Sequence, residues 1–155
     1  MQTPATAALD AAGIPYRTAE YDPPAAGGYG DAVVAALGLD PDAVGKTLVV
    51  GLDDGRHVAA VVPVSADLDL KAIARVAGAK RATMAEHTDA ERLTGTVVGG
   101  ISPLGMRRPL PVFVDELLTV GDEVHVSGGR RGLEVTLAPA DLVRATGATV
   151  GDIAT

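Results

Sequence analysis

Residues 46–64 read K-T-L-V-V-G-L-D-D-G-R-H-V-A-A-V-V-P-V. Two β-rich runs, Lys46–Leu52 and His57–Val64, are joined across Asp53-Asp54-Gly55, and an Asp-Gly turn between two apolar runs is a strong signal for a β-hairpin. The first of these runs is the most apolar strand expected in the chain. At least some of the strands of this protein must therefore pair antiparallel.

The segments on either side of this hairpin alternate irregularly between helix and strand. Thr3–Gly13 predicts a helix, with Thr3 as N-cap, Pro4 in the first position and Gly13 just beyond the end. Further helices are expected at Asp31–Leu37, Leu68–Ala77, Ala85–Leu93 and Pro139–Thr146, and further strands at Ile14–Tyr21, Val112–Val114, Glu123–Val126 and Leu133–Leu137. The alternation of a doubly wound fold is missing, so the pattern favours an α+β protein with a mixed, curved sheet.

Composition excludes several classes of protein. The chain has 155 residues, which is one domain in size, and 47% of them are hydrophobic, which excludes disorder throughout. It contains no cysteine, so disulfides, thiolate nucleophiles and cysteine-ligated metals are excluded. The first ten residues do not resemble a signal peptide and no run of 18 apolar residues occurs, so we expect a cytoplasmic protein without a membrane partner.

The formal net charge is −7, from 13 basic and 20 acidic residues. This balance argues against non-specific binding to nucleic acid, DNA included, because phosphate neutralisation needs clustered Lys and Arg. Two arginine pairs, Arg107-Arg108 and Arg130-Arg131, indicate at most a small anion site. A broad basic surface is not predicted.

The common catalytic motifs are missing. His57, His87 and His125 have no partner at metal-ligand spacing, so no metal site is predicted. Ser65, Ser102 and Ser127 lie in no G-x-S-x-G sequence, which argues against a serine hydrolase. No Walker loop and no G-x-G-x-x-G fingerprint follows a strand, so we expect no nucleotide cofactor and no cofactor of another kind.

Three segments have both a structural and a functional interpretation. Lys46, one of three lysines, opens the most apolar strand, where it either extends its stem along apolar surface or presents a positive charge to a phosphate or an oxyanion. The segment S-G-G-R-R-G at Ser127–Gly132 is either a hairpin turn or an anion-binding nest with Ser127 as a further donor. The loop Gly99–Gly105 is either a plain turn or a surface where backbone approaches a ligand closely.

Taken together, these segments carry a resemblance to a known family. The combination of G-K-T-L-V at residues 45–49, V-G-G-I-S-P-L-G at Val98–Gly105 and V-S-G-G-R-R-G-L-E at Val126–Glu134 resembles the YbaK/EbsC family, and more closely its Cys-tRNA(Pro) deacylases. The likeness covers essentially the whole chain. It implies a single domain over residues 1–155, related to the editing domain of prolyl-tRNA synthetase, with a curved, partly barrel-like mixed sheet flanked by helices.

The resemblance also implies a site. Lys46 would be the central catalytic residue, near the 3′-terminal adenosine of tRNA. Glu134 stands where close relatives often have Asp, and Tyr29 where they often have Phe. The residues expected to bind substrate are Tyr21, Tyr29, Thr47, Gly100, Ser102, Ser127, Gly128 and Glu134.

The function that this resemblance implies is hydrolysis of a mischarged aminoacyl-tRNA in trans, with Cys-tRNA(Pro) as the substrate and prolyl-tRNA synthetase as a candidate partner. In the mechanism associated with the family, the thiol of the substrate attacks its own carbonyl and expels the tRNA, a lyase-type step. Two alternatives stay open: a deacylase for another small amino acid such as Ala, and a non-catalytic module that binds a nucleotide or the end of a tRNA.

Overall fold

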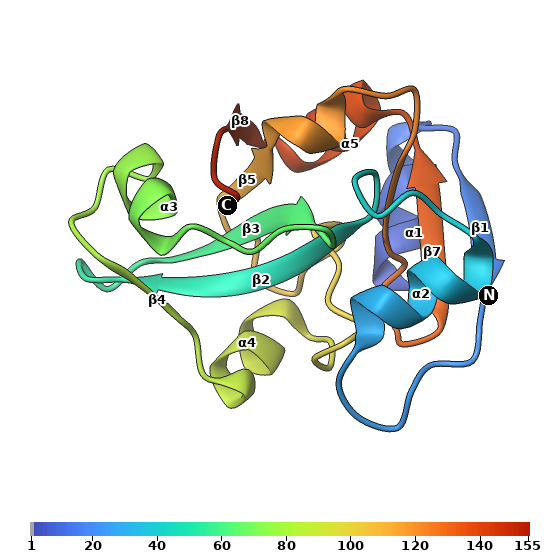
Figure 1. The fold of residues 1–155 in the computed structure, drawn as a ribbon, viewed down its shortest axis with the longest axis horizontal. Coiled ribbons are helices and arrows are strands. Elements are labelled where there is room, and N and C mark those ends of the chain that lie inside the picture. The colour runs from blue at the N-terminus through green and yellow to red at the C-terminus, as the bar shows by residue number, and fades with distance from the viewer. Residues whose placement is uncertain (1) are drawn as a thin grey trace.

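The computed structural model describes residues 2–155, and its strands form two sheets (Figure 1). One sheet has three strands in the order β1 (Arg17–Glu20), β7 (Leu133–Leu137) and β6 (Val124–Ser127). The other has five strands in the order β4 (Ala82–Met84), β2 (Gly45–Leu52), β3 (His57–Pro63), β5 (Val112–Asp115) and β8 (Thr149–Gly151).

The predicted hairpin is confirmed, and it forms two adjacent strands inside the larger sheet. β2 and β3 pair antiparallel from Gly45–Pro63 to Gly51–His57. Their turn closes through a bond from the Leu52 N–H to the Arg56 carbonyl, and Gly55 takes a positive φ of 93°, which a glycine adopts without strain. β3 then pairs in parallel with β5, and β5 with β8, so the sheet is mixed as expected.

Helices cover these sheets: α1 (Pro4–Ala12), α2 (Tyr29–Leu37), α3 (Leu70–Val76), α4 (His87–Thr94), α5 (Pro139–Thr146) and the 3₁₀ turn η1 (Glu116–Thr119). Thr3 caps α1 as predicted, since its side chain accepts from the Thr6 N–H, and Gly13 ends the helix in a left-handed conformation. α3 begins later than expected because the Asp69 carboxylate accepts from the Ala72 N–H and caps it there. Among residues 2–155, no helix combines the length and the apolar character that a membrane crossing requires.

The sequence patterns did not predict β4, β8 or η1. Each is three or four residues long, too short to show a period, and β4 and β8 form because β2 and β5 supply their hydrogen-bond partners. The predicted strand Ile14–Tyr21 is shorter than expected, at Arg17–Glu20, because only these residues pair with β7.

The core has two main parts on opposite faces of the five-stranded sheet. One lies between the sheets and includes Leu9, Val61, Val114 and Val126, and the other lies under α3 and includes Ile73 and Phe113. Gly45 leaves room for its neighbours, since a Cβ there would lie 2.7 Å from Cγ1 of Val61 in the adjacent strand and 3.4 Å from Cγ1 of Val126 in the other sheet. A single parallel bridge, Val44–His125, links the two sheets. The α+β architecture is thus confirmed, and the curved surface is open and does not close into a barrel.

Candidate active site

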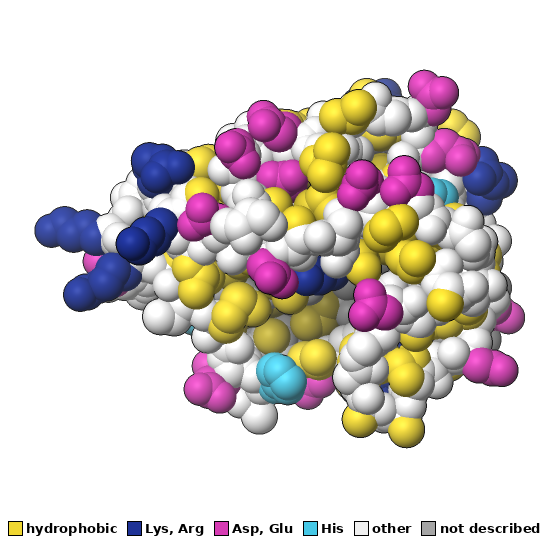
Figure 2. All heavy atoms as spheres, viewed as in Figure 1, with side chains coloured by type: hydrophobic (Ala, Val, Ile, Leu, Met, Phe, Trp, Pro, Cys, Tyr) yellow, Lys and Arg dark blue, Asp and Glu magenta, His cyan; other side chains and the backbone are white. Residues whose placement is uncertain are grey.

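A cavity of about 500 Å³ lies at the start of β2, where the larger sheet meets the ends of β6 and β7 in the smaller one (Figure 2). Its walls come from the first turns of α2 and α4, from β2, from the loop around residues 98–101 and from the ends of β6 and β7. Its volume suits the small, largely preformed sites that bind part of a ligand. Six predicted site residues line it: Tyr21, Tyr29, Lys46, Thr47, Ser127 and Glu134.

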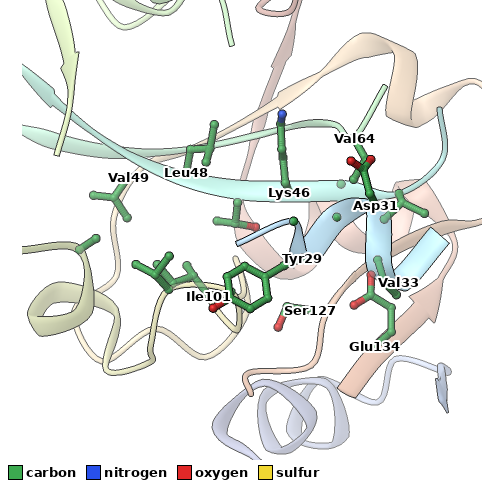
Figure 3. Close-up of a pocket in the computed structure, with 18 of the residues that line it drawn as sticks. Tyr29, Asp31, Val33, Lys46, Leu48, Val49, Val64, Ile101, Ser127 and Glu134 are labelled. Carbon is green, nitrogen blue, oxygen red and sulfur yellow. The ribbon is translucent and has the colours of Figure 1, made fainter. Parts of the chain in front are cut away.

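The cavity wraps around a free edge of β2. One edge of this strand pairs with β3 along nearly its whole length, whereas β4 pairs with the other edge only at Val50–Leu52. The second edge at residues 46–48 has no strand partner within residues 2–155. Lys46 and Leu48 extend from one side of the strand, while Val49 extends from the other, toward Ile101 and Tyr29 (Figure 3). A ligand bound at this edge therefore meets both faces of β2.

Lys46 is held at the entrance to the cavity with its charge available. Its side chain is 33% exposed, and its Nζ lies 3.7 Å from Oδ1 of Asp67, whose own side chain is 91% exposed. An ion pair so open to water contributes little to the stability of the fold, because solvent screens the attraction between the two charges. The ammonium can therefore exchange Asp67 for an anionic group of a ligand.

Glu134 is the most unusual residue of the site. It is only 4% exposed, and its register partner across the β6–β7 pair is Ser127, so the two side chains share one face of the sheet. No hydrogen bond to its carboxyl group is made by residues 2–155. Burial raises the pKa of Glu134 to about 8, because the charged form loses its hydration.

Tyr21 lies beside this carboxyl group. Burial raises the pKa of the Tyr21 phenol, and the negative charge of Glu134 raises it further. Thr47 adds a second unpartnered polar group, since its buried Oγ1 has no hydrogen-bond partner in the described chain. A buried polar atom without a partner is uncommon, and here both groups border a cavity, where a ligand can bind to them.

Tyr29 forms a wall of the cavity, and the backbone is built to receive it. The Arg131 guanidinium lies 5.0 Å from the centre of its ring, and Nε of Arg131 donates to the Val98 carbonyl at 2.8 Å. A Cβ on Gly99, whose φ is 92°, would lie 2.7 Å from the same ring. Arg131 thereby fixes Tyr29 and the loop at residue 98 to each other.

Gly100, Ser102 and Gly128 are not among the lining residues. Gly100 packs behind the wall, where a Cβ would meet the Arg131 amide at 2.7 Å, and its carbonyl accepts from Ser127 Oγ at 2.9 Å. Ser102 is buried, and its Oγ accepts from the Leu104 N–H. Gly128 donates its N–H to the Leu133 carbonyl. In the structure these three residues shape and support the wall.

The segment Ser127–Gly132 is a turn, in which the two adjacent glycine amides are hydrogen-bonded within the fold. The Gly128 N–H donates to the Leu133 carbonyl and the Gly129 N–H donates to Ser127 Oγ, so these two amides are not free for an anion. Arg130 pairs with Glu20, with NH2 and Oε1 2.6 Å apart. Because Arg131 contacts Tyr29, both arginines of this segment are bound within the fold.

The cavity also contains residues that the sequence patterns did not indicate. Asp31 and Val33 follow Tyr29 in α2, Asp67 faces Lys46, and His87 begins α4 at the rim. Asp31 and Val33 could have been inferred from their place in the turns after Tyr29; Asp67 and His87 carry no signal, because only the fold brings them here. Within residues 2–155, no group of three His, Cys, Asp or Glu side chains could hold a metal ion.

Comparison with known proteins agrees with this geometry. The model of the aminoacyl-tRNA editing domain family matches residues 24–145, so the chain belongs to this family. The chain is 34% identical over 125 residues to EbsC of Enterococcus faecalis, a proposed Cys-tRNA(Pro)/Cys-tRNA(Cys) deacylase. The match covers 81% of this chain and 76% of EbsC. It is 32% identical over 97 residues to ProXp-y of Escherichia coli, a multifunctional Ser/Thr-tRNA deacylase, covering 62% and 58% of the two chains.

A solved structure matches the fold throughout. The crystal structure of a proposed trans-editing enzyme for prolyl-tRNA synthetase superimposes with a TM-score of 0.86 at 28% identity, covering 100% of this chain and 99% of the other. Together, the family and these relatives support deacylation of aminoacyl-tRNA as the activity of this protein.

Proposed function

We propose that this protein is a trans-editing enzyme that clears Cys-tRNA(Pro), and that the cysteinyl ester is cleaved with the help of the substrate's own thiol. One observation carries the proposal: a cation and a buried, unpartnered carboxyl group lie on opposite sides of the β2 edge, and nothing between them is an activated nucleophile. The EbsC relative supports the choice of cysteine.

The two charged groups match the two ends of an aminoacyl-adenosine. Lys46, at the exposed entrance, binds the phosphate of the terminal nucleotide as a point charge. Glu134, in the buried part, accepts hydrogen bonds from the α-ammonium group of the amino acid and becomes ionised as that cation arrives. The ester then lies across the free edge of β2, whose backbone N–H groups can donate to its carbonyl oxygen.

Within residues 2–155, no hydroxyl at this position is held by a general base that would activate it as a nucleophile. The chain has no cysteine, and the Ser127 hydroxyl donates to the Gly100 carbonyl rather than to a general base. His125 lies on the same strand, but its Nδ1 is hydrogen-bonded to Thr136 at 2.6 Å. A serine without a base and an orienting group lacks the arrangement that activates a nucleophile.

In the proposed step, the substrate sulfur bonds to the carbonyl carbon, the ester C–O bond breaks, and the thiol proton passes to the leaving ribose oxygen. The product is uncharged tRNA and a cyclic thioester, which water opens to cysteine. Positioning the thiol against its carbonyl can lower the barrier by roughly 7–11 kcal/mol in well-aligned intramolecular cases. Lys46 and Glu134 supply that positioning by holding both ends of the substrate.

One observation favours a second substrate class. Thr47 Oγ1 is buried at the cavity without a partner, so it can pair with a hydroxyl of a seryl or threonyl group. The ProXp-y relative acts on that class. Such a substrate has no thiol, so water would be the nucleophile.

The test is a panel of purified aminoacyl-tRNAs carrying Cys, Ala, Ser, Thr or Pro on tRNA(Pro), with loss of the ester followed over time. We expect rapid loss of the cysteinyl ester and retention of the prolyl ester. Faster loss of Ser or Thr selects the second class, and no loss of any ester, beside an active control deacylase, refutes an enzymatic role.

Two variants separate charge from fold at the entrance. Lys46→Ala removes the proposed phosphate contact and should reduce the deacylation rate by at least tenfold, whereas Lys46→Arg keeps the charge and should retain more of it. Asp67→Asn is the matched control, because it breaks the same exposed ion pair without removing the cation. Full activity of Lys46→Ala would contradict the assignment.

Co-purification with prolyl-tRNA synthetase, with and without tRNA, tests whether this synthetase is a partner.

A further inference from the structure

The fold gathers basic residues at one end of the molecule. Figure 2 shows blue side chains over the end where Figure 1 places α3, β4 and the β2–β3 turn. These basic residues come from a stretch of 26 residues, 56–81, and only Lys80 and Arg81 are adjacent in the sequence. The group, called the basic end below, contains Arg56, Lys71, Arg75, Lys80 and Arg81.

Hydrogen bonds hold this end together. The Asp53 carboxylate accepts from the backbone N–H groups of Lys80 and Arg81 at 3.0 and 3.1 Å, and the Asp53 N–H donates to the Arg81 carbonyl. Arg56 donates to the Ala77 carbonyl at 2.8 Å. The β2–β3 turn is therefore bound to the segment between α3 and β4, and the basic side chains share one surface.

Most of these cations have no partner in the protein. Arg56 pairs with Asp54, but within residues 2–155 no carboxylate lies within salt-bridge distance of Lys71, Arg75, Lys80 or Arg81, and all four are exposed. Counted against Asp53, Asp54 and Asp69, the N-cap of α3, the five cations give the basic end a net charge of about +2 in a chain whose formal charge is −7. Acidic residues outnumber basic ones in the rest of the chain, so this end is the part of the surface in Figure 2 with the densest positive charge.

The basic end is connected to the cavity by two strands. β4 (Ala82–Met84) follows Arg81 and ends at Met84, which lines the cavity, and β2 leads from Lys46 to the turn. Leu52 lies six residues from Lys46, about 20 Å at the usual rise of a strand. A stacked nucleic-acid strand advances about 3.4 Å per nucleotide, so this distance spans roughly six nucleotides. That is beyond the single-stranded 3′ end of a tRNA and into its first base pairs.

We infer that the basic end binds the phosphate backbone of the tRNA acceptor stem while the cavity holds the aminoacyl end. This inference rests on the proposed function, and it names the contact that lets an acidic protein bind a polyanion. The surface lacks the apolar centre expected of a protein interface, since Val76 and Met84 are the only large hydrophobic residues exposed near it in the described chain.

The test measures binding rather than catalysis, using an uncharged acceptor-stem hairpin RNA ending in CCA and the isolated single-stranded end. The variants are Lys80→Ala/Arg81→Ala and Lys71→Ala/Arg75→Ala. Both leave the backbone bonds to Asp53 in place. The matched control is Arg17→Ala/Arg144→Ala, which makes the same change in net charge at two exposed arginines on β1 and α5.

For each basic-end variant we expect the Kd for the hairpin to rise roughly tenfold, and the slope of log K against log salt to fall by about 1.4–1.8 in magnitude for two lost phosphate contacts. The control should retain the wild-type Kd and slope, and binding of the single-stranded end should change in none of the variants. Equal effects in the control and the basic-end variants would overturn the inference, as would an unchanged hairpin Kd.

Two further outcomes are distinguishable. Loss of prolyl-tRNA synthetase binding with an unchanged hairpin Kd would assign the basic end to an acidic protein surface and refute the RNA contact. If the wild-type protein binds the hairpin through the basic end but hydrolyses no ester, the proposed function fails while the RNA-binding surface stands.

Discussion

Glu134→Gln is the substitution with the most calculable outcome, because it replaces a buried carboxyl group by a neutral group of nearly the same shape. The pKa of Glu134 is raised from an ordinary value of 4.5 to about 8, with burial as the cause. Between these two pH values the folded protein binds a proton that the unfolded chain releases. Raising the pH therefore favours the unfolded chain, and this group lowers the free energy of unfolding as the pH rises.

The magnitude follows from the two pKa values. One pKa unit corresponds to about 1.36 kcal/mol, so the full cost above pH 8 is of order 5 kcal/mol. Between pH 5 and pH 7 the wild-type protein should lose about 2–3 kcal/mol through this one residue. Glutamine does not titrate, so the Gln variant should lose none of it and should become relatively more stable as the pH rises.

The assay is urea unfolding of both proteins at pH 5, 6, 7 and 8, with the difference in unfolding free energy plotted against pH. Comparing the two proteins cancels the other titrating groups they share. If the difference does not change between pH 5 and pH 7, Glu134 is ionised in the free protein and the proposed role of a carboxyl group that ionises on ligand binding is wrong. An aminoacyl-adenosine analogue with an α-ammonium group should reduce the difference at pH 7.

Three other substitutions test the walls of the cavity and the start of the fold. Gly99→Ala places a methyl group against the Tyr29 ring at a φ of 92°, so it should cost about 1–3 kcal/mol of stability and at least tenfold in deacylation; wild-type values in both assays would show that the loop simply moves. Arg131→Gln removes the cation from Tyr29 and the bond to the Val98 carbonyl. It should raise KM for the aminoacyl-tRNA with little loss of unfolding free energy, whereas an unchanged KM with a large loss of unfolding free energy would make Arg131 purely structural. Thr3→Ala removes the cap of α1 and the bond to the Gly128 carbonyl, so thermal unfolding should show a loss of about 1–2 kcal/mol, and an unaltered Tm would contradict that role.

The predictions from sequence succeed where the signal is local. The Asp-Gly turn, the cap at Thr3 and the glycine after each of several helices depend on neighbouring residues, so the hairpin and all five helices were expected at nearly the right places. β4 and β8 were missed because three residues show no period. The partners of the Gly128 and Gly129 amides were not evident from the sequence, because only the folded chain brings these partners into place.

The sequence by itself determined the mixed α+β class, the absence of a thiol nucleophile, and the family, because each depends on composition or on short motifs that can be recognised in isolation. Only the tertiary structure decided how Lys46 and Glu134 are arranged. They are 88 residues apart in the chain and lie on two sheets joined by one bridge, so nothing local relates them. The raised pKa of Glu134 arises from burial, and the basic end arises from hydrogen bonds between a turn and a loop. Both are properties of how segments distant in the chain pack together.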